Sequence, residues 1–223
     1  MTDSTNEPLI VVERVRKRYD DARPAVDDLS FSVARGEFVL LTGPTGAGKT
    51  TVLRLLAALE PPSSGRIAIA GVEIAKLKRR ARAALRRSIG IVPQDLLLLA
   101  DRTALENVML PALVSGLPRA DARHRAQAAL TRVGVADTAQ RSRALSAGAQ
   151  QRIALARAIV NRPALILADE PTAHLDAGAA ARILRLLDEF SASGIAVLLA
   201  SHGENVALPA RTRVLRLAGG RMV

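Results

Sequence analysis

A glycine-rich stretch at residues 43–50 has the residue types and the spacing of a phosphate-binding loop. It reads Gly-Pro-Thr-Gly-Ala-Gly-Lys-Thr and fits the pattern G-x-x-x-x-G-K-[ST]. The glycines allow backbone N–H groups to point at an anion, and a following helix adds the positive end of its dipole. In this pattern Lys49 reaches the outer phosphates of a nucleotide, and the Thr50 hydroxyl binds Mg²⁺. We therefore predict a nucleotide phosphate site here.

Two adjacent carboxylates follow an apolar segment later in the chain. Residues 165–168 are Leu-Ile-Leu-Ala and lead directly into Asp169 and Glu170. At the tip of a strand, Asp169 suits Mg²⁺, either directly or through a water molecule. Glu170, one residue further on, can polarise an attacking water molecule as a general base. Together with the upstream loop, this pair predicts a site for nucleotide hydrolysis.

The elements that must position these residues are β-strands joined by helices. An apolar run at 38–42 precedes the glycine-rich loop, and apolar residues at 52, 55, 56 and 59 predict a helix that stops at Pro61. Buried strands are predicted at 164–168 and 195–200, with a helix between them at 178–191. Long crossovers of this kind predict a parallel sheet with helices on both faces, which binds ligands at the carboxyl ends of its strands.

The remaining segments divide into short strands and a helical insertion. Strands are predicted at 9–15, 29–33, 66–70 and 89–92, and a hairpin turn is predicted at Gly219-Gly220. Helices are predicted at 75–87, 103–117 with a break at Pro111, 119–133 and 146–161. We therefore expect one domain, 1–223. Its helical subdomain, 95–161, would interrupt a nucleotide-binding core formed by 1–94 and 162–223.

Composition limits the classes to which this chain can belong. Its 223 residues are 49% hydrophobic, which is enough for a folded core. The absence of cysteine excludes disulfides, thiolate catalysis and cysteine-based zinc sites. No apolar run approaches the roughly 18–20 residues needed to span a bilayer, and the polar, acidic segment 1–8 is not typical of a signal peptide.

The net charge of +11 is most concentrated at residues 76–87, which hold two lysines and five arginines. This run fits either a solvated helix face or a surface attracted to the anionic inner leaflet of a membrane. Nucleic-acid binding would require an aromatic platform or a groove-reading motif, and neither accompanies the charge. We therefore expect no nucleic-acid partner, and the first two interpretations stay open.

Further motifs make the chain resemble the ATP-binding subunits of ABC transporters over nearly its whole length. Besides the loop and the carboxylates, these are Tyr19, Gln94, a signature Leu-Ser-Ala-Gly-Ala-Gln-Gln at 145–151, His174-Leu175-Asp176 and His202. The resemblance implies ATP and Mg²⁺ as cofactors and a homodimer that closes around ATP, with each signature facing the partner's loop. It also implies an α/β fold with a P-loop NTPase (RecA-like) core, a mixed or parallel sheet, an antiparallel β subdomain and an inserted α-helical subdomain.

The resemblance also gives each matching residue an expected role. Tyr19 would stack on adenine, Gln94 would join the core to the helical subdomain, and His202 would contact the γ-phosphate. The expected nucleotide-binding residues are Tyr19, Gly43, Pro44, Thr45, Gly46, Ala47, Gly48, Lys49, Thr50, Thr51, Ser146, Gly148, Gln150 and Asp176. The expected metal ligands are Thr50, Gln94 and Asp169, and the expected catalytic residues are Glu170, His202, Lys49 and Gln94.

One branch of the family, the ATPases of FtsE–FtsX cell-division complexes, is the most similar. The similar segments are 101–103, 106–108 with Pro111, and 158–163 leading into 168–172. This resemblance implies an FtsX-like integral membrane partner, signalling to a cell-wall hydrolase, and a peripheral position on the cytoplasmic face of the inner membrane. Lipoprotein-release and macrolide-type exporters share much of the pattern and remain the alternative. A nucleotide-gated dimerisation switch with little turnover is a third interpretation.

The chain departs from the family pattern around the signature. Ala147 and Ala149 replace glycine and glutamate, His174 replaces asparagine, and Gly203 replaces aspartate. An alanine can block a backbone conformation with positive φ or crowd a phosphate. We therefore expect an ATPase whose turnover the altered signature slows. The length excludes repair ATPases with coiled-coil insertions and tandem translation ATPases, and the joint motifs exclude a small-molecule kinase.

Overall fold

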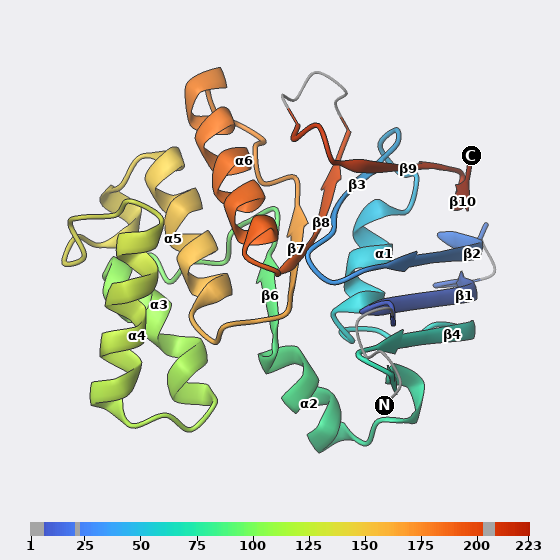
Figure 1. Cartoon of the computed structure of the whole chain (residues 1–223), viewed down its shortest axis with the longest axis horizontal. Helices are drawn as coiled ribbons and strands as arrows, with labels where there is room; N and C mark the ends of the chain where they lie inside the picture. Colours follow the sequence, from blue (N-terminus) through green and yellow to red (C-terminus); the bar gives the residue numbers. More distant parts are fainter. Residues whose placement is uncertain (1–6, 21–22, 203–207) are drawn as a thin grey trace.

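The computed structural model describes residues 7–20, 23–202 and 208–223. Its first sheet is antiparallel, in the order β2-β1-β4-β5 (Figure 1). The bounds of these strands are Ile10–Lys17 for β1, Val26–Val33 for β2, Ser64–Ile69 for β4 and Val72–Glu73 for β5. This sheet is the predicted antiparallel β subdomain.

The second sheet has the order β10-β9-β3-β8-β7-β6, in which only β10 runs antiparallel to its neighbour. Its strands are β3 (Phe38–Thr42), β6 (Ile89–Val92), β7 (Leu165–Asp169), β8 (Ala196–Ser201), β9 (Arg213–Ala218) and β10 (Arg221–Met222). The predicted α/β class with a mixed, largely parallel sheet is confirmed. The register places Thr42 beside Ser201 and Asp169 beside Ala200, so the carboxyl ends of β3, β7 and β8 lie level.

The core strands of this sheet are buried on both faces, and alternate residues enter two different cores. In β3, Phe38 and Leu40 pack in one core, whereas Val39 and Leu41 pack in the other. The second core includes α1 (Lys49–Leu56) and the antiparallel sheet. The first includes α5 (Ala147–Ile159) and α6 (Ala177–Ala192). The short aliphatic strands therefore fix helices on both faces, as the sequence predicts.

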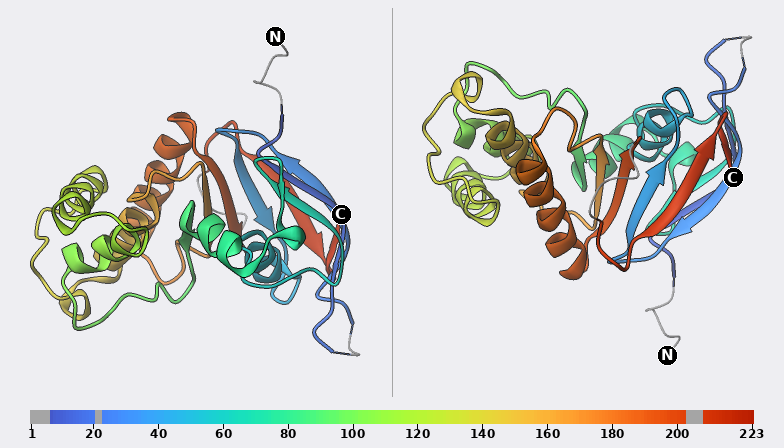
Figure 2. Two further views of the ribbon diagram at one scale, coloured as in Figure 1. Left: turned by 90° about the horizontal axis from the view of Figure 1, so that it is seen from below. Right: turned by 90° about the horizontal axis from the view of Figure 1, so that it is seen from above.

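The remaining helices of the insertion are α3 (Ala104–Val114) and α4 (Arg119–Arg132), with a short 3₁₀ turn η2 (Ser142–Ala144) before α5. They lie to one side of the sheets (Figure 2). Thr103 and Glu106 form a capping box at the start of α3. The fully buried Asn107 donates hydrogen bonds to the Leu99 carbonyl and to Ser142 Oγ, so its amide joins the segments on both sides of α3.

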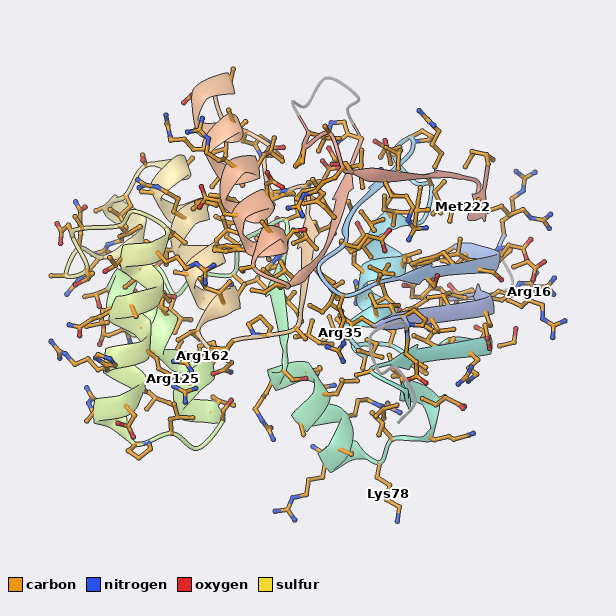
Figure 3. All side chains as sticks on the ribbon, in the orientation of Figure 1. Arg16, Arg35, Lys78, Arg125, Arg162 and Met222 are labelled. Carbon is orange, nitrogen blue, oxygen red and sulfur yellow. The ribbon has the colours of Figure 1, made fainter. Side chains whose placement is uncertain are left out.

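The basic run forms a 3₁₀ turn η1 (Ile74–Lys76) followed by α2 (Arg79–Arg87), which has no buried residue. Lys78, the residue before α2 begins, projects away from the body of the molecule (Figure 3). Within the described part of the chain, no helix is long and apolar enough to cross a membrane.

Three helix predictions differ from the structure. The helix after the glycine-rich loop ends at Leu56, because Ala58 adopts a left-handed φ of 52°, and Leu59 is consequently 54% exposed. Pro111 lies inside α3 and does not break it. Packing of α3 against α4 and α5 offsets the roughly 3 kcal/mol that an internal proline costs. The helix predicted at 75–87 is shorter, since α2 begins at Arg79.

Candidate active site

The glycine-rich loop connects β3 to α1 and depends on glycine at both of its ends. Gly43 and Gly48 adopt φ values of 151° and 102°. A Cβ atom at Gly43 would lie 2.1 Å from the Leu217 carbonyl oxygen, and one at Gly48 would lie 2.3 Å from the Ala25 carbonyl oxygen. Any side chain at these two positions would clash with the backbone behind the loop. The loop is therefore held against its surroundings with its backbone turned as a phosphate cradle requires.

Lys49, the first residue of α1, is buried and folds back over the loop. Its Nζ donates to the carbonyl oxygens of Gly43, at 2.7 Å, and of Pro44, at 3.2 Å. Both acceptors are neutral, so the ammonium charge is not cancelled by these contacts. The helix N-terminus adds positive potential at the same place. The Lys49 ammonium and the helix N-terminus together make the loop suited to bind a polyanion such as a phosphate chain.

Thr50 and Asp169 lie together at the adjoining strand end. Burial raises the pKa of the Asp169 carboxyl, and the nearby Glu170 charge raises it further. A hydrogen bond with Thr50 and the charge of Lys49 oppose this shift. A hydroxyl and a carboxylate at hydrogen-bond distance are suitable donors for Mg²⁺, which is held in proteins by one or two carboxylates plus substrate phosphates. The described residues contain no cluster of three histidine, cysteine or acidic side chains for a metal.

Glu170 follows β7 with a strained backbone and a defined partner. Its φ is 46°, and its amide donates to the Ala200 carbonyl of β8 at 2.9 Å. Its Oε1 lies 2.8 Å from Nδ1 of His202, and the Glu170 side chain is only 11% exposed. A left-handed backbone conformation is uncommon for glutamate, and such strain concentrates at functional sites. The carboxylate is thus aimed and partly shielded, as a general base requires.

The structure brings most of the predicted site residues into one cleft. Residues 45–51 of the loop and of α1 line it together with Gln94, Glu170 and His202. A neighbouring cavity of about 260 Å³ adds Asp169 and is also lined by Thr50 and Gln94. Residues from four strand ends therefore meet where a nucleotide phosphate chain and its metal would lie.

Tyr19 lies beside α1 and does not line this cleft. The residue is 53% exposed, and the Lys17 ammonium lies 5.0 Å from the centroid of its ring. Burial of its hydroxyl and a hydrogen bond with Glu60 raise the pKa of Tyr19, whereas a hydrogen bond with Thr51 lowers it. The Thr51 contact anchors the tyrosine next to the phosphate loop, with an aromatic surface open for stacking.

The signature residues lie apart from the cleft. Ser146, Gly148, His174 and Asp176 line a separate cavity that shares no lining residue with the loop cleft. Ser146 Oγ accepts the Ala149 amide at the start of α5, and Asp176 Oδ1 accepts the Ala179 amide at the start of α6. Gln150 does not line this cavity; its side-chain amide donates to the Leu145 carbonyl. Two of the chain's helix N-termini therefore flank a second site.

The predicted backbone conflict at the alanines of the signature is wrong. Ala147 and Ala149 are in the first turn of α5, and neither has a positive φ. Alanine fits this helical backbone without strain. His174 does adopt a left-handed φ of 63° and is exposed beside the signature. Gly203 lies outside the described residues.

Sequence reasoning missed an arginine that contacts the Gln94 loop. The Arg157 guanidinium donates to the Leu97 carbonyl at 2.6 Å and to the Leu96 carbonyl. Leu96 and Leu97 have φ values of 54° and 50°, a conformation that costs about 1–2 kcal/mol for each residue that carries a side chain. The signal was an arginine in an otherwise apolar run, 153–160.

Comparisons with known proteins agree with this geometry. The family model described as "ABC transporter" matches residues 26–173. The chain belongs to the ABC family of ATPases. It is 43% identical to the cell division ATP-binding protein FtsE of Escherichia coli (96% of this chain, 97% of that protein) and 44% identical to the lipoprotein-releasing ATP-binding protein LolD of Cereibacter sphaeroides (96% and 99%).

FtsE of Mycobacterium tuberculosis is 42% identical (96% of this chain, 94% of that protein). The dimeric structure of the ABC transporter cassette MJ0796 superposes with a TM-score of 0.86 at 32% identity and covers 96% of both chains. A second structure of that cassette, also with a TM-score of 0.86, is a dimer in a post-hydrolysis state with ADP and phosphate. The chain is thus an ATP-binding ATPase with this family's fold.

The raised pKa of Asp169 predicts a pH-dependent stability change. Folding raises the pKa, so the folded protein binds this proton more readily, and the carboxylate destabilises the fold increasingly as pH rises. Asp169→Asn should therefore raise the melting temperature of the nucleotide-free protein at pH 7–8. The gain should vanish below about pH 3, where both states approach full protonation because a free aspartate has a pKa of about 3.9. Calorimetry at several pH values measures this, and an equal gain at all pH values would contradict it.

Glu170→Gln should abolish most hydrolysis without preventing ATP binding. The amide keeps the shape of the side chain but cannot accept a proton, so phosphate release should fall about 10²- to 10⁴-fold. The affinity for ATP should stay within about twofold, because the phosphate loop is unchanged. Steady-state phosphate release measures the first value and equilibrium dialysis the second. Glu189→Gln, an exposed substitution on α6, is the control. Wild-type turnover no faster than that of Glu170→Gln would refute Glu170 as the base.

Proposed function

We propose that this chain is the ATP-binding and hydrolysing subunit of an FtsEX-like complex. Two copies close around ATP and drive an integral membrane partner, which signals to cell-wall hydrolysis during division. The observation that carries the proposal is similarity to FtsE proteins of distant bacteria over nearly the full length of both chains. The chain also holds ATPase residues in one cleft, as an energy-converting subunit requires.

The proposed roles use the residues that line the cleft and its neighbouring cavity. Lys49 and the loop amides hold the β- and γ-phosphates, and Thr50, Asp169 and Gln94 hold Mg²⁺. The metal supplies charge neutralisation at the phosphates. Glu170 accepts a proton from the attacking water molecule, and His202, paired with it, contacts the γ-phosphate.

The two separate cavities favour a site shared between two copies. Ser146, Gly148 and Asp176 line a different cavity from the residues of the phosphate loop in their own chain. In a two-fold dimer each signature meets the partner's loop, and the N-terminus of α5 points at the γ-phosphate. Gln150 acts within its own chain by holding the Leu145 carbonyl. Tyr19 stacks on the adenine of the nucleotide bound to its own loop.

An export function is the second candidate, since LolD matches at a similar identity. Export and division ATPases can share the same cleft, so the membrane partner decides between them. The third interpretation, a dimerisation switch with little turnover, is less well supported. A shielded Glu170 in contact with His202 is the arrangement that a general base needs, which favours hydrolysis. Ala147 and Ala149 cause no backbone conflict, so any slowing of turnover would come from crowding of the partner's phosphate.

We place the subunit at the cytoplasmic face of the inner membrane, held by its partner. The helix α2 gives it a second, electrostatic contact with anionic headgroups. It has basic residues in both its first and last turns and no acidic residue, and its N-terminal arginines oppose the helix dipole. Glu73, just before α2, pairs with Lys76, whereas Arg80 and Arg87 are exposed and have no ion pair among the described residues. Anionic lipid would relieve this repulsion.

The identity of the membrane partner distinguishes a division function from an export function. Co-expressed with a four-helix protein that has one extracytoplasmic domain between its first two helices, the chain should co-purify in detergent. Glu170→Gln should be captured equally, because the substitution spares the surface. Capture by a lipoprotein-release permease under the same conditions, and not by the four-helix protein, would overturn the division assignment and favour export.

The lipid contact predicts charge-dependent vesicle binding. The double variant Arg80→Gln/Arg87→Gln should bind vesicles rich in phosphatidylglycerol about thirtyfold more weakly than wild type, because each of the two cations contributes about 1 kcal/mol. The matched control is Arg119→Gln/Arg123→Gln, which removes the same charge from exposed positions on α4. Co-flotation at low salt measures binding. An equal loss in both variants would show that net charge alone, and not α2, controls binding.

A further inference from the structure

Arg157 links the signature helix to the loop that carries Gln94. It lies near the C-terminal end of α5, and its guanidinium contacts the carbonyl oxygens of Leu96 and Leu97. These contacts join residues that are 60 and 61 positions apart in the chain. Arg157 therefore acts on the Gln94 loop directly, from the helix that begins at the signature.

These two contacts are the main compensation for the charge of Arg157. The side chain is partly buried, and burial lowers the pKa of the guanidinium. Among the described residues, no carboxylate lies within ion-pair distance of Arg157. A partly desolvated cation with no counter-ion depends strongly on its hydrogen-bond acceptors. The arginine and the two carbonyls are therefore mutually dependent.

The loop, in turn, depends on Arg157. Leu96 and Leu97 both adopt left-handed backbone conformations, which leucine does not favour. The Leu96 amide is satisfied by the Pro93 carbonyl at 3.0 Å, whereas the two carbonyl oxygens of the leucines turn toward α5. Without a fork of donors at this place the strained turn would relax. Gln94 lies two residues before Leu96 and would move with it.

The consequence reaches the ATP site. Gln94 and Leu97 line the cavity that also contains Thr50 and Asp169. The same helix that carries Arg157 is capped by Ser146, eleven residues earlier and about 16 Å away along the axis at 1.5 Å per residue. A helix is stiff over this length, so movement of its N-terminus is transmitted to Arg157.

We propose that Arg157 is a positioning residue that holds Gln94 at the metal site and transmits the position of the signature helix to it. The proposal rests on the proposed role of Gln94 as a metal ligand. Arg157 itself touches neither nucleotide nor metal. It acts by fixing the left-handed turn at Leu96 and Leu97.

The test compares Arg157→Met with Arg157→Lys in the full chain. Arg157→Met keeps an unbranched apolar stem and removes the donors, so it should raise the Mg²⁺ concentration for half-maximal ATPase activity about tenfold. Lysine supplies one point charge in place of a planar fork and should recover part of the loss. Amide hydrogen exchange of residues 94–99 should be faster in Arg157→Met, with exchange in α5 unchanged. Arg132→Met, which removes the bond from α4 to Ser193, is the control and should change neither value.

A double-mutant cycle with Gln94→Ala decides the route. If Arg157 acts through Gln94, then in the Gln94→Ala background Arg157→Met should cause little further increase in the Mg²⁺ concentration for half-maximal activity. Equal losses in both backgrounds would overturn the proposal and leave the role of Gln94 intact. No effect of Gln94→Ala alone would overturn the metal role of Gln94 and the proposal with it. If Arg157→Met does not fold, amide exchange at residues 94–99 in Arg157→Lys decides the matter. One point charge recovers only part of the contact, so fully wild-type exchange rates there would refute the positioning role of Arg157.

Discussion

The parallel register of four neighbouring strands determines where the chemistry of this chain lies. Because β3, β8, β7 and β6 run side by side in the same direction, the residues that follow them emerge at one edge. Those residues are the phosphate loop, His202, Glu170 and Gln94. Each strand alternates its aliphatic side chains between two cores, so a shift of one strand would expose core residues and displace a site residue at the same time.

Strain and desolvation mark the same edge. Glu170, Leu96 and Leu97 hold left-handed backbones, and burial raises the pKa of Asp169. Each of these features costs folding free energy, and each is held in place by a specific neighbour: the Ala200 carbonyl for Glu170, Arg157 for the leucines and Thr50 for Asp169. Proteins retain such costs mainly where binding or catalysis needs a fixed geometry. The site is therefore preorganised before a nucleotide arrives.

Local signals in the sequence predict most of this arrangement. Periodicity finds the strands, and the spacing of glycine, lysine and carboxylates finds the phosphate loop and Asp169-Glu170. Local signals do not predict effects that depend on residues distant in the sequence. Packing retains Pro111 inside α3, a left-handed Ala58 ends α1 early, and the Arg157 contacts join segments 60 residues apart. The expected strain at Ala147 was wrong because a pattern of residues does not show which glycines in a motif use their conformational freedom.

The central claim is that one chain holds half of each ATP site. The most direct measurement is the mass in solution of Glu170→Gln with saturating ATP, by light scattering. The account predicts twice the 23.6 kDa of one chain. With Ser146→Arg added, the mass should return to that of one chain while ATP still binds, because Ser146 lies outside the loop cleft. A single-chain mass for Glu170→Gln with bound ATP, or a dimer that persists with Ser146→Arg, would contradict the shared site.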